Sequence, residues 1–204
     1  PINSPDLKTF LSDARDVLFI VNDATRPTPT ARVIDIIIDD IKNLNMKFII
    51  ATGCHRAPTP EEYEQIFGKY YETFKDRIFS HDSRKDEMVY LGKSKNDTEM
   101  HVNKLGVEAH KIVIIGSVEP HYFGGYTGGR KSFLPGIASF KTIEQNHKLA
   151  LSPGAKSLAL EGNPVHEDMI DALTTVKKEI FSIQTVLDKH HKIYAATAGH
   201  INDS

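Results

Sequence analysis

Short apolar runs rich in β-branched and aromatic side chains recur along the chain. Runs of this length and composition are typical of buried strands. They predict strands over Asp16–Val21, Lys47–Thr52, Arg77–Ser80 and Lys111–Ser117, with shorter strands over Met88–Leu91 and Glu99–Val102. A closing β-hairpin is predicted from Phe181–Leu187 and Ile193–Thr197, and no clear terminal element is predicted from Gly199 onward.

Between these runs, apolar residues recur at helical spacing. The clearest case is Ala31–Asn43, where one face is apolar and the other is charged. A cap at Asp6 and a capping box formed by Thr59 and Glu62 predict where two further helices begin. The complete set of predicted helices is Leu7–Ala14, Ala31–Asn43, one from Pro60, a turn over Asn103–Ala109, Phe140–Ala150 and Pro164–Lys178, with a loop over Ser152–Glu161.

Strands that alternate with helices predict an α/β domain over residues 1–204, with a Rossmann-like, largely parallel sheet and flanking helices. In such a sheet, polar residues just past the strand ends converge on one crevice. Four clusters follow predicted strands: Asp23-Ala24-Thr25-Arg26, His55-Arg56, His81-Asp82, and His121 with its glycine-rich loop. We therefore expect one functional site at this edge of the sheet.

Composition and charge narrow the class of protein. The chain has 204 residues and a formal net charge of −2, which suits one packed domain and gives no case for nucleic acid or a membrane as partner. No apolar run approaches the ~20 residues of a spanning helix, and no signal-peptide pattern opens the chain. The single cysteine, Cys54, rules out an internal disulfide and a cysteine metal cluster. These features predict a cytoplasmic protein.

The most informative stretch is His121–His147, which has a histidine at each end and Lys131 in a glycine-rich loop between them. Glycines at this density allow backbone N–H groups to close on an anion. The spacing is not that of a Walker loop, so Lys131 is interpreted either as a phosphate ligand or as a point of covalent attachment. His147 follows a helical pattern, and a histidine there most often lies on the helix surface.

Two histidines follow neighbouring strands, His55 and His121. Because imidazole titrates near neutral pH, the pair suits an acid and a base that flank one substrate, although two exposed loop histidines explain the pattern equally well. Asp23 and Arg26 lie in a tight turn. That turn fits an Asx-turn with a solvated arginine, or an arginine fork for carboxylate or phosphate. The other histidines are expected to be structural or solvated.

These motifs, taken in order, closely resemble the nickel-pincer lactate racemase family. The resemblance rests on the segments Asp23–Pro27, Ala51–Arg56, Glu119–Ser132 and Leu134–Ser139, followed by His147. It extends over nearly the whole chain. The stretch His121–His147 is its most specific part, whereas the Asp-x-x-Arg-Pro turn alone is a weak signal.

The resemblance implies a particular cofactor. Family members use a nickel-pincer nucleotide, a pyridinium-3,5-bisthiocarboxylic acid mononucleotide that holds nickel through two sulfurs and one ring carbon. By this resemblance, Lys131 is joined covalently to the cofactor and His147 supplies the fourth nickel ligand. A square-planar divalent nickel ion suits soft sulfur donors with one imidazole. Recombinant protein made without the cofactor-synthesis proteins is expected to lack this group.

The resemblance also implies an isomerase reaction. His55 and His121 would be the catalytic acid/base pair of a 2-hydroxy-acid racemase or epimerase, acting on lactate or a related acid by hydride transfer through the cofactor. Asp23, Thr25 and Arg26 would bind the cofactor, and Arg26 would also hold the substrate carboxylate.

Family enzymes have a second domain beyond the point where this chain stops. The resemblance therefore implies that residues 1–204 are a cofactor-binding domain from a longer two-domain enzyme, and that the isolated domain is inactive. The implied partners are the 2-hydroxy acid, the C-terminal domain of the same enzyme, and the proteins that synthesise the cofactor and insert nickel. The sequence does not specify which 2-hydroxy acid is used.

Two other classes of function stay open at the level of sequence. The glycine loop suits a non-catalytic nucleotide- or phosphate-binding module as well. A histidine-ligated hydrolytic zinc site is a weaker alternative. Such sites usually take three protein ligands with a close-spaced pair, and neither H-x-x-x-H nor H-x-H occurs in this sequence.

Overall fold

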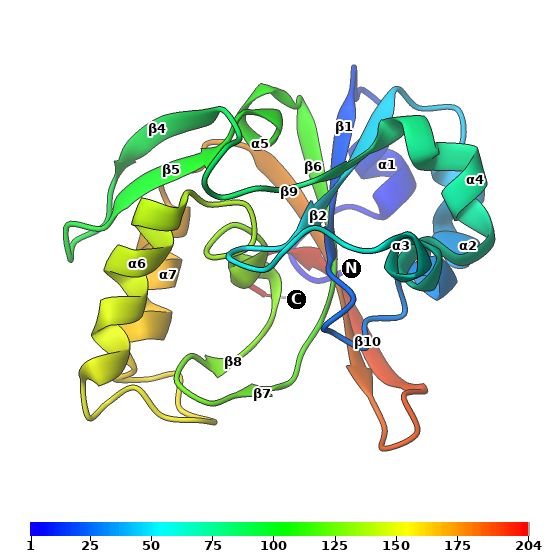
Figure 1. The fold of residues 1–204 in the computed structure, drawn as a ribbon. Helices are drawn as coiled ribbons and strands as arrows, with labels where there is room; N and C mark the ends of the chain where they lie inside the picture. Colours follow the sequence, from blue (N-terminus) through cyan, green and yellow to red (C-terminus); the bar gives the residue numbers. More distant parts are fainter. Residues whose placement is uncertain (204) are drawn as a thin grey trace.

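Six strands form the central sheet of the computed structural model, which describes residues 1–203 (Figure 1). In sheet order they are β10 (Ile193–His200), β9 (Glu179–Leu187), β6 (Lys111–Ser117), β1 (Val17–Asn22), β2 (Met46–Ala51) and β3 (Ile78–Ser80). All neighbouring pairs are parallel except β9 and β10, which pair antiparallel at one edge. The predicted α/β fold with a largely parallel sheet is confirmed.

Helices cover both faces of this sheet (Figure 1). One face is covered by α1 (Leu7–Leu11), α2 (Thr30–Ile41), α3 (Pro60–Phe67) and α4 (Tyr71–Phe74). On the other side lie α5 (Lys104–Glu108), α6 (Phe140–Lys148), α7 (Pro164–Leu173) and the two-stranded sheet of β4 (Met88–Lys93) and β5 (Glu99–Asn103). Within residues 1–203, no helix has both the length and the apolar content needed to cross a membrane.

Strand β1 shows why the predicted strands are continuously apolar. Val17, Phe19 and Val21 belong to the core cluster on the α2 side, whereas Leu18 and Ile20 belong to the cluster on the α7 side. Successive side chains of a strand point to opposite faces, so a sheet covered on both faces needs apolar residues at every position. All five side chains are at most 2% exposed. The polar residues that follow the strand are therefore the first that can reach a solvent-accessible site.

The helix predicted over Pro164–Lys178 ends earlier, at Leu173. The next residues are Thr174, Thr175 and Val176, and β-branched side chains lose χ1 freedom in a helix. The two threonine hydroxyls also donate to the backbone carbonyls three residues before them, at 2.6 and 2.7 Å. Local side-chain bonding thus competes with continuation of the helix.

The C-terminal strand extends further than predicted, because β10 reaches His200 instead of ending at Thr197. The first residues of the chain lie beside it. Ile2 N–H donates to Ala198 O at 2.8 Å, and His200 N–H donates to Ile2 O at 2.9 Å. The prediction of no clear terminal element from Gly199 onward is therefore wrong for Gly199 and His200. Ser204 lies outside the described residues.

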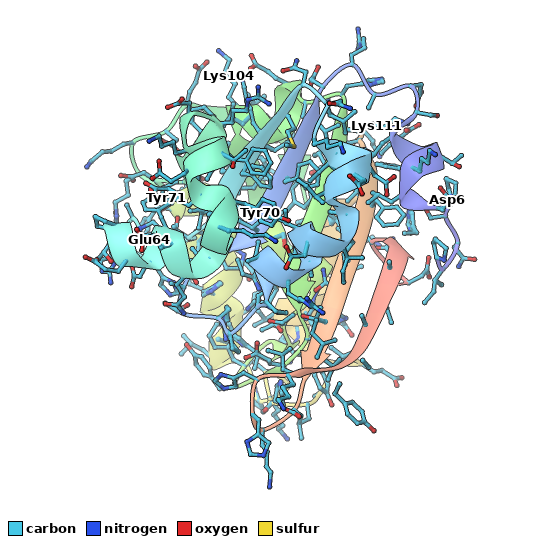
Figure 2. The ribbon with its side chains drawn as sticks, turned by 90° about the vertical axis from the view of Figure 1, so that its right-hand side faces the viewer. Asp6, Glu64, Tyr70, Tyr71, Lys104 and Lys111 are labelled. Atoms are coloured by element: carbon cyan, nitrogen blue, oxygen red, sulfur yellow. The ribbon has the colours of Figure 1, made fainter. Side chains whose placement is uncertain are left out.

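Figure 2 looks onto the layer formed by α2, α3 and α4. There the Tyr70 hydroxyl donates to Asp35 at 2.7 Å. At the start of β6, the buried Lys111 ammonium donates to the Phe10 carbonyl and pairs with the carboxylates of Asp13 and Glu179. This one ammonium ties α1 to two strands of the sheet.

Phe48 on β2 provides a test of this packing. It is fully buried, and its ring contacts those of Phe19, Phe67 and Phe74 at centroid distances of 5.0, 5.4 and 5.3 Å. Phe48→Ala is expected to lower the free energy of unfolding in urea denaturation by about 3–5 kcal/mol. The control Phe79→Ala on β3, where the side chain is 40% exposed, should cost about 1 kcal/mol or less. Equal losses would contradict this assignment of the core.

Candidate active site

One cavity lies beside the carboxyl ends of β1, β2 and β6, with β9 contributing part of its wall. Six of the seven predicted site residues line it: Asp23, Arg26, His55, His121, Lys131 and His147. The seventh, Thr25, is not part of the lining, and its hydroxyl instead donates to Asp23 Oδ1 at 2.6 Å. The structure therefore gathers residues from four separate segments of the chain, as expected for the edge of a parallel sheet.

Asp23 and His55 form a hydrogen-bonded pair, with His55 Nδ1 2.6 Å from Asp23 Oδ2. Asp23 is buried, whereas the side chain of His55 is 55% exposed. Since a carboxylate only accepts hydrogen bonds, the shared proton belongs to Nδ1, and Nε2 presents its lone pair. A carboxylate in this position also stabilises the imidazolium that forms when Nε2 takes a proton. The pair thus has the arrangement of a general base with an orienting group, a contact that the sequence analysis did not predict.

The turn that holds His55 is secured from two sides. Gly53 adopts a φ of +57°, in the left-handed region that favours glycine. Arg56 donates to both carboxylate oxygens of Glu62 at 2.7 and 2.8 Å, and this pairing holds the pKa of Glu62 at about 2. Glu62 also completes the capping box of α3 with Thr59. Arg56 therefore does not line the cavity and instead anchors the turn to α3.

His121 is 8% exposed and is held by its own loop, because the Gly124 N–H donates to His121 Nδ1 at 3.1 Å. With Nδ1 as an acceptor, the proton of the neutral ring lies on Nε2. Burial, followed by the positive charges of Lys131 and Arg26, lowers the pKa of His121 to about 3. His121 is therefore neutral at pH 7 and offers an N–H donor, whereas His55 offers a lone pair.

Lys131 lies with its ammonium nitrogen 5.8 Å from the centroid of the Phe123 ring, and no carboxylate pairs with it in the described part of the chain. Burial, followed by the charges of Arg130 and Arg26, lowers the pKa of Lys131 to about 7. A large share of this side chain is therefore a neutral amine at pH 7. The neutral amine is the nucleophilic form, so Lys131 is prepared for covalent attachment.

Arg130 shapes the loop from inside. Its buried guanidinium donates to the backbone carbonyls of Thr127, Gly124 and Tyr126 at 3.1, 3.1 and 2.8 Å. Burial lowers the pKa of Arg130 to about 10, so the side chain is still charged at pH 7. It thus places a buried positive charge next to Lys131, a role that the sequence analysis did not assign to it.

The glycines of the loop are required by contacts within the protein. Gly125 has a φ of +74°, and a Cβ there would lie 2.1 Å from the carbonyl oxygen of Ala159. The N–H groups of Gly124, Tyr126 and Lys131 already donate to acceptors of the loop itself. The glycine pattern suggests that backbone N–H groups of this loop bind an anion. These three N–H groups are not free to do so.

The Phe123 ring packs against the rings of two histidines. Its ring lies edge-on to His121 and His147, with centroid distances of 4.6 and 5.0 Å and interplanar angles of 85° and 74°. Its carbonyl accepts a hydrogen bond from the fully buried Asn163, whose side chain also caps α7. Burial, followed by the charge of Lys131, lowers the pKa of His147 to about 4. The ring is therefore neutral at pH 7, the form that binds metals.

Besides Lys131, the cavity wall has two side chains with polar atoms that are unpaired within residues 1–203. The Arg26 guanidinium makes no hydrogen bond or ion pair there, and such a group is a common ligand for carboxylate or phosphate. Gln184 on β9 is 1% exposed, and its Oε1 accepts no hydrogen bond while its Nε2 donates to Ser182. Leaving a buried acceptor unpaired is costly, so Gln184 Oε1 indicates a ligand with a matching donor. The half-buried Arg26 guanidinium suits a ligand with an anionic acceptor. A glutamine inside an apolar strand was the sequence signal for this position.

His147 is the one predicted metal ligand. The described residues contain no group of three or more His, Cys, Asp or Glu side chains placed to hold a metal ion. His147 thus presents a single imidazole to the cavity. His81 lies outside the cavity, buried with Nε2 3.0 Å from the Ala138 carbonyl, as expected for a structural histidine.

Comparison with known proteins adds independent information. Residues 1–157 match the family model described as "Lactate racemase N-terminal domain". The chain is 38% identical over 207 residues to a lactate racemase from Thermoanaerobacterium thermosaccharolyticum, and 35% identical over 208 residues to one from Lactiplantibacillus plantarum. Each alignment covers 98% of this chain and 48% of the relative, so the chain spans about half the length of the curated relatives it matches.

Solved structures agree with these matches. The structure of the lactate racemase apoprotein from Thermoanaerobacterium thermosaccharolyticum superimposes with a TM-score of 0.93 at 37% identity, covering 100% of this chain and 50% of that one. A crystal structure of a Thermotoga maritima protein gives a TM-score of 0.78 at 21% identity, covering 94% of this chain and 52% of that one. At that identity, the second match shows the fold alone.

The low pKa of Lys131 predicts an unusual reactivity. Acetylation of Lys131 by acetic anhydride, followed by peptide mass spectrometry over a pH series, should reach half its maximal rate near pH 7, since only the neutral amine reacts. Exposed lysines are the internal reference, because an unburied ammonium has a pKa of about 10.4.

Arg26→Gln should move that midpoint upward, because it removes a positive charge that disfavours the ammonium form. The matched control is Arg32→Gln on α2, where the side chain is 70% exposed, and it should leave the midpoint unchanged. A Lys131 that titrates together with the exposed lysines would contradict the assigned electrostatics.

Proposed function

The chain belongs to the lactate racemase N-terminal domain family, and on that premise we propose that it is the cofactor-binding part of a 2-hydroxy-acid racemase or epimerase. One observation is its main support. A single cavity contains the Asp23–His55 pair with a free lone pair, His121 with a free N–H, and the unpaired Arg26. These groups suit a small substrate with a carboxylate and an adjacent hydroxyl.

The residues present fit a nickel-pincer nucleotide. Lys131 has the burial and the reactive amine that a covalent tether requires, and His147 offers one neutral imidazole to a metal that has other donors. The unpaired Oε1 of Gln184 suits a hydroxyl or N–H donor of a nucleotide. When bound, the cofactor supplies the hydride acceptor and donor that inversion of a 2-hydroxy acid needs.

The protein side chains then perform the binding and proton steps. Arg26 holds the carboxylate of the substrate and fixes its orientation. His55 Nε2 takes the hydroxyl proton, and Asp23 stabilises the imidazolium that forms. His121 donates a hydrogen bond to substrate oxygen from the other side.

The two imidazoles are not equivalent in this geometry. His55 accepts a proton directly, whereas the lone pair of His121 is already used by the Gly124 N–H. For His121 to serve as a base on the opposite face of the substrate, its ring must release that contact. The acid/base pair expected from the resemblance therefore requires a small rearrangement of the loop before His121 can accept a proton at Nδ1.

We also propose a substrate class and a location for the rest of the substrate pocket. Two relatives of about twice this length are lactate racemases by name, so lactate or a related 2-hydroxy acid is the proposed substrate class. We place the rest of the substrate pocket in a C-terminal domain of the same enzyme. Cofactor-synthesis and nickel-insertion proteins are the further partners that the proposal requires.

Covalent loading is the direct test. When the chain is produced together with the cofactor-synthesis and nickel-insertion proteins, mass spectrometry should show an adduct on the peptide that contains Lys131. The conservative variant Lys131→Arg should stay unmodified, because its guanidinium stays protonated and is not a nucleophilic amine.

A folded chain that stays unmodified, while another lactate racemase is loaded in the same cells, would overturn the proposal. Tight binding of ATP or NAD in calorimetry, with Lys131 unmodified, would instead favour a non-catalytic nucleotide- or phosphate-binding module. The free guanidinium of Arg26 is the feature that keeps this alternative open.

The histidines should separate by role in the full-length enzyme. His55→Gln and His121→Gln are expected to lower racemisation by about 10²–10⁴-fold with nickel retained, the range for loss of a general acid or base. The racemisation rate of Asp23→Asn should lie between those of the wild type and His55→Gln, because this variant keeps the base but removes the carboxylate that orients it. His147→Gln should lose nickel, as measured by metal analysis, with the Lys131 adduct intact. Nickel lost equally from all four variants would refute this division of roles.

A further inference from the structure

A buried polar network lies behind His147, outside the cavity and unused by the reaction described above. Its centre is Asp168 on α7, which is fully buried. Asp168 accepts hydrogen bonds from Ser94 and Thr98, in the connection between β4 and β5, and from Asn146 on α6. Burying a carboxylate is unfavourable unless it accepts hydrogen bonds, and here three donors from the β4–β5 connection and α6 stabilise it.

The positions of the protons in this network follow from its geometry. Ser94 Oγ accepts the backbone N–H groups of Asn96 and Thr98, both at 3.2 Å, so its own proton is directed to Asp168. The Thr98 hydroxyl donates to Asp168 Oδ2 at 2.8 Å. Asp168 is therefore an acceptor on both oxygens, and the amide of Asn146 must turn its NH₂ group toward it.

The amide of Asn146 has only one acceptable orientation. Its Nδ2 donates to Asp168 Oδ2 at 2.8 Å and to the Val165 carbonyl at 3.2 Å. A reversed amide would bring its oxygen against two acceptors, which is repulsive. Asn146 Oδ1 is therefore directed away from Asp168, and it lies 3.2 Å from Nδ1 of His147. Because Asn146 is fully buried, water does not compete for these bonds.

We propose that Asn146, held by Asp168, is a positioning residue that keeps the proton of His147 on Nδ1 and leaves the Nε2 lone pair free as the donor for a metal in the cavity. Metal-binding histidines commonly donate their other ring N–H to a neighbouring acceptor, which fixes the tautomer and the ring orientation. The imidazole of His147 makes no other hydrogen bond within residues 1–203, and His147 lines the cavity. The metal-donor part rests on the proposed function, whereas the tautomer does not.

The same network also joins α6, α7 and the β4–β5 connection, so a purely structural role is the alternative. The two roles predict different measurements. A structural role affects stability alone, whereas a positioning role affects which ring nitrogen of His147 has the proton.

The tautomer is measured by NMR on the chain with ¹⁵N-labelled histidine at neutral pH, from long-range ¹H–¹⁵N correlations. The signals of His147 are identified by their absence in His147→Gln. The wild type should show the proton on Nδ1 of His147. In Asn146→Leu the acceptor is gone, and the proton should shift to Nε2, which free histidine prefers. A wild-type His147 with its proton on Nε2 overturns the proposal, whether or not any variant folds.

Ser94→Ala is the matched control. It removes one donor to Asp168 from the same buried network but leaves Asn146 in its orientation, so stability should fall while the His147 tautomer is unchanged. If Ser94→Ala shifts the tautomer as much as Asn146→Leu does, the effect is structural and the proposal is overturned.

A second measurement addresses the metal. In cofactor-loaded full-length enzyme, the nickel affinity per Lys131 adduct should fall by about 10–100-fold in Asn146→Leu and stay unchanged in Ser94→Ala. Unchanged nickel affinity in Asn146→Leu overturns the positioning role even if the tautomer shifts. If no adduct forms in the wild type, the proposed function fails, and the NMR result then decides the tautomer alone.

Discussion

Arg130 is a buried cation with no carboxylate partner in the described residues, and the chemistry of the cavity depends on this constraint. Its guanidinium stays charged because three backbone carbonyls of the loop accept its protons. Burial is the main cause of the low pKa values of Lys131 and His121, and the positive charge of Arg130 lowers both further, more directly for Lys131. The same carbonyls must turn inward to reach Arg130. One buried side chain thus helps to set both the shape of the loop and the reactivity of the Lys131 amine.

The parallel sheet explains why these groups meet. The carboxyl ends of β1, β2 and β6 deliver Asp23, His55 and His121 to one side of the molecule, and α6 brings His147 to the same cavity. Because the central residues of these strands are apolar and buried on both faces, the functional polar side chains follow the ends of the strands. The turn that holds His55 is fixed by hydrogen bonds, among them those of the Arg56–Glu62 pair.

Hydrogen bonds to groups around the cavity determine which ring nitrogen of each lining histidine has the proton. Asp23 sets the tautomer of His55, the Gly124 N–H sets that of His121, and Asn146 sets that of His147. Each ring is held through Nδ1, but His121 is held by a donor and the other two by acceptors. The three histidines therefore present different atoms to a ligand, although they are chemically identical in the sequence. This difference is the physical basis for assigning them different roles.

The sequence by itself determined the alternation of strands and helices, because hydrophobic periodicity and helix caps are local signals, and it determined which segments would meet at one edge of the sheet. It also predicted seven candidate residues, of which all but Thr25 line the cavity, while the Thr25 hydroxyl donates to Asp23. Only the tertiary structure decided the contacts of Asp23 with His55, the place of Phe123 between two rings, the unpaired Gln184 and the network of Asp168. These contacts join residues far apart in the chain, and packing between elements, which leaves no local signal, brings them together. The end of α7 and the length of β10 were missed for related reasons, since side-chain bonds and pairing with Ile2 decided them.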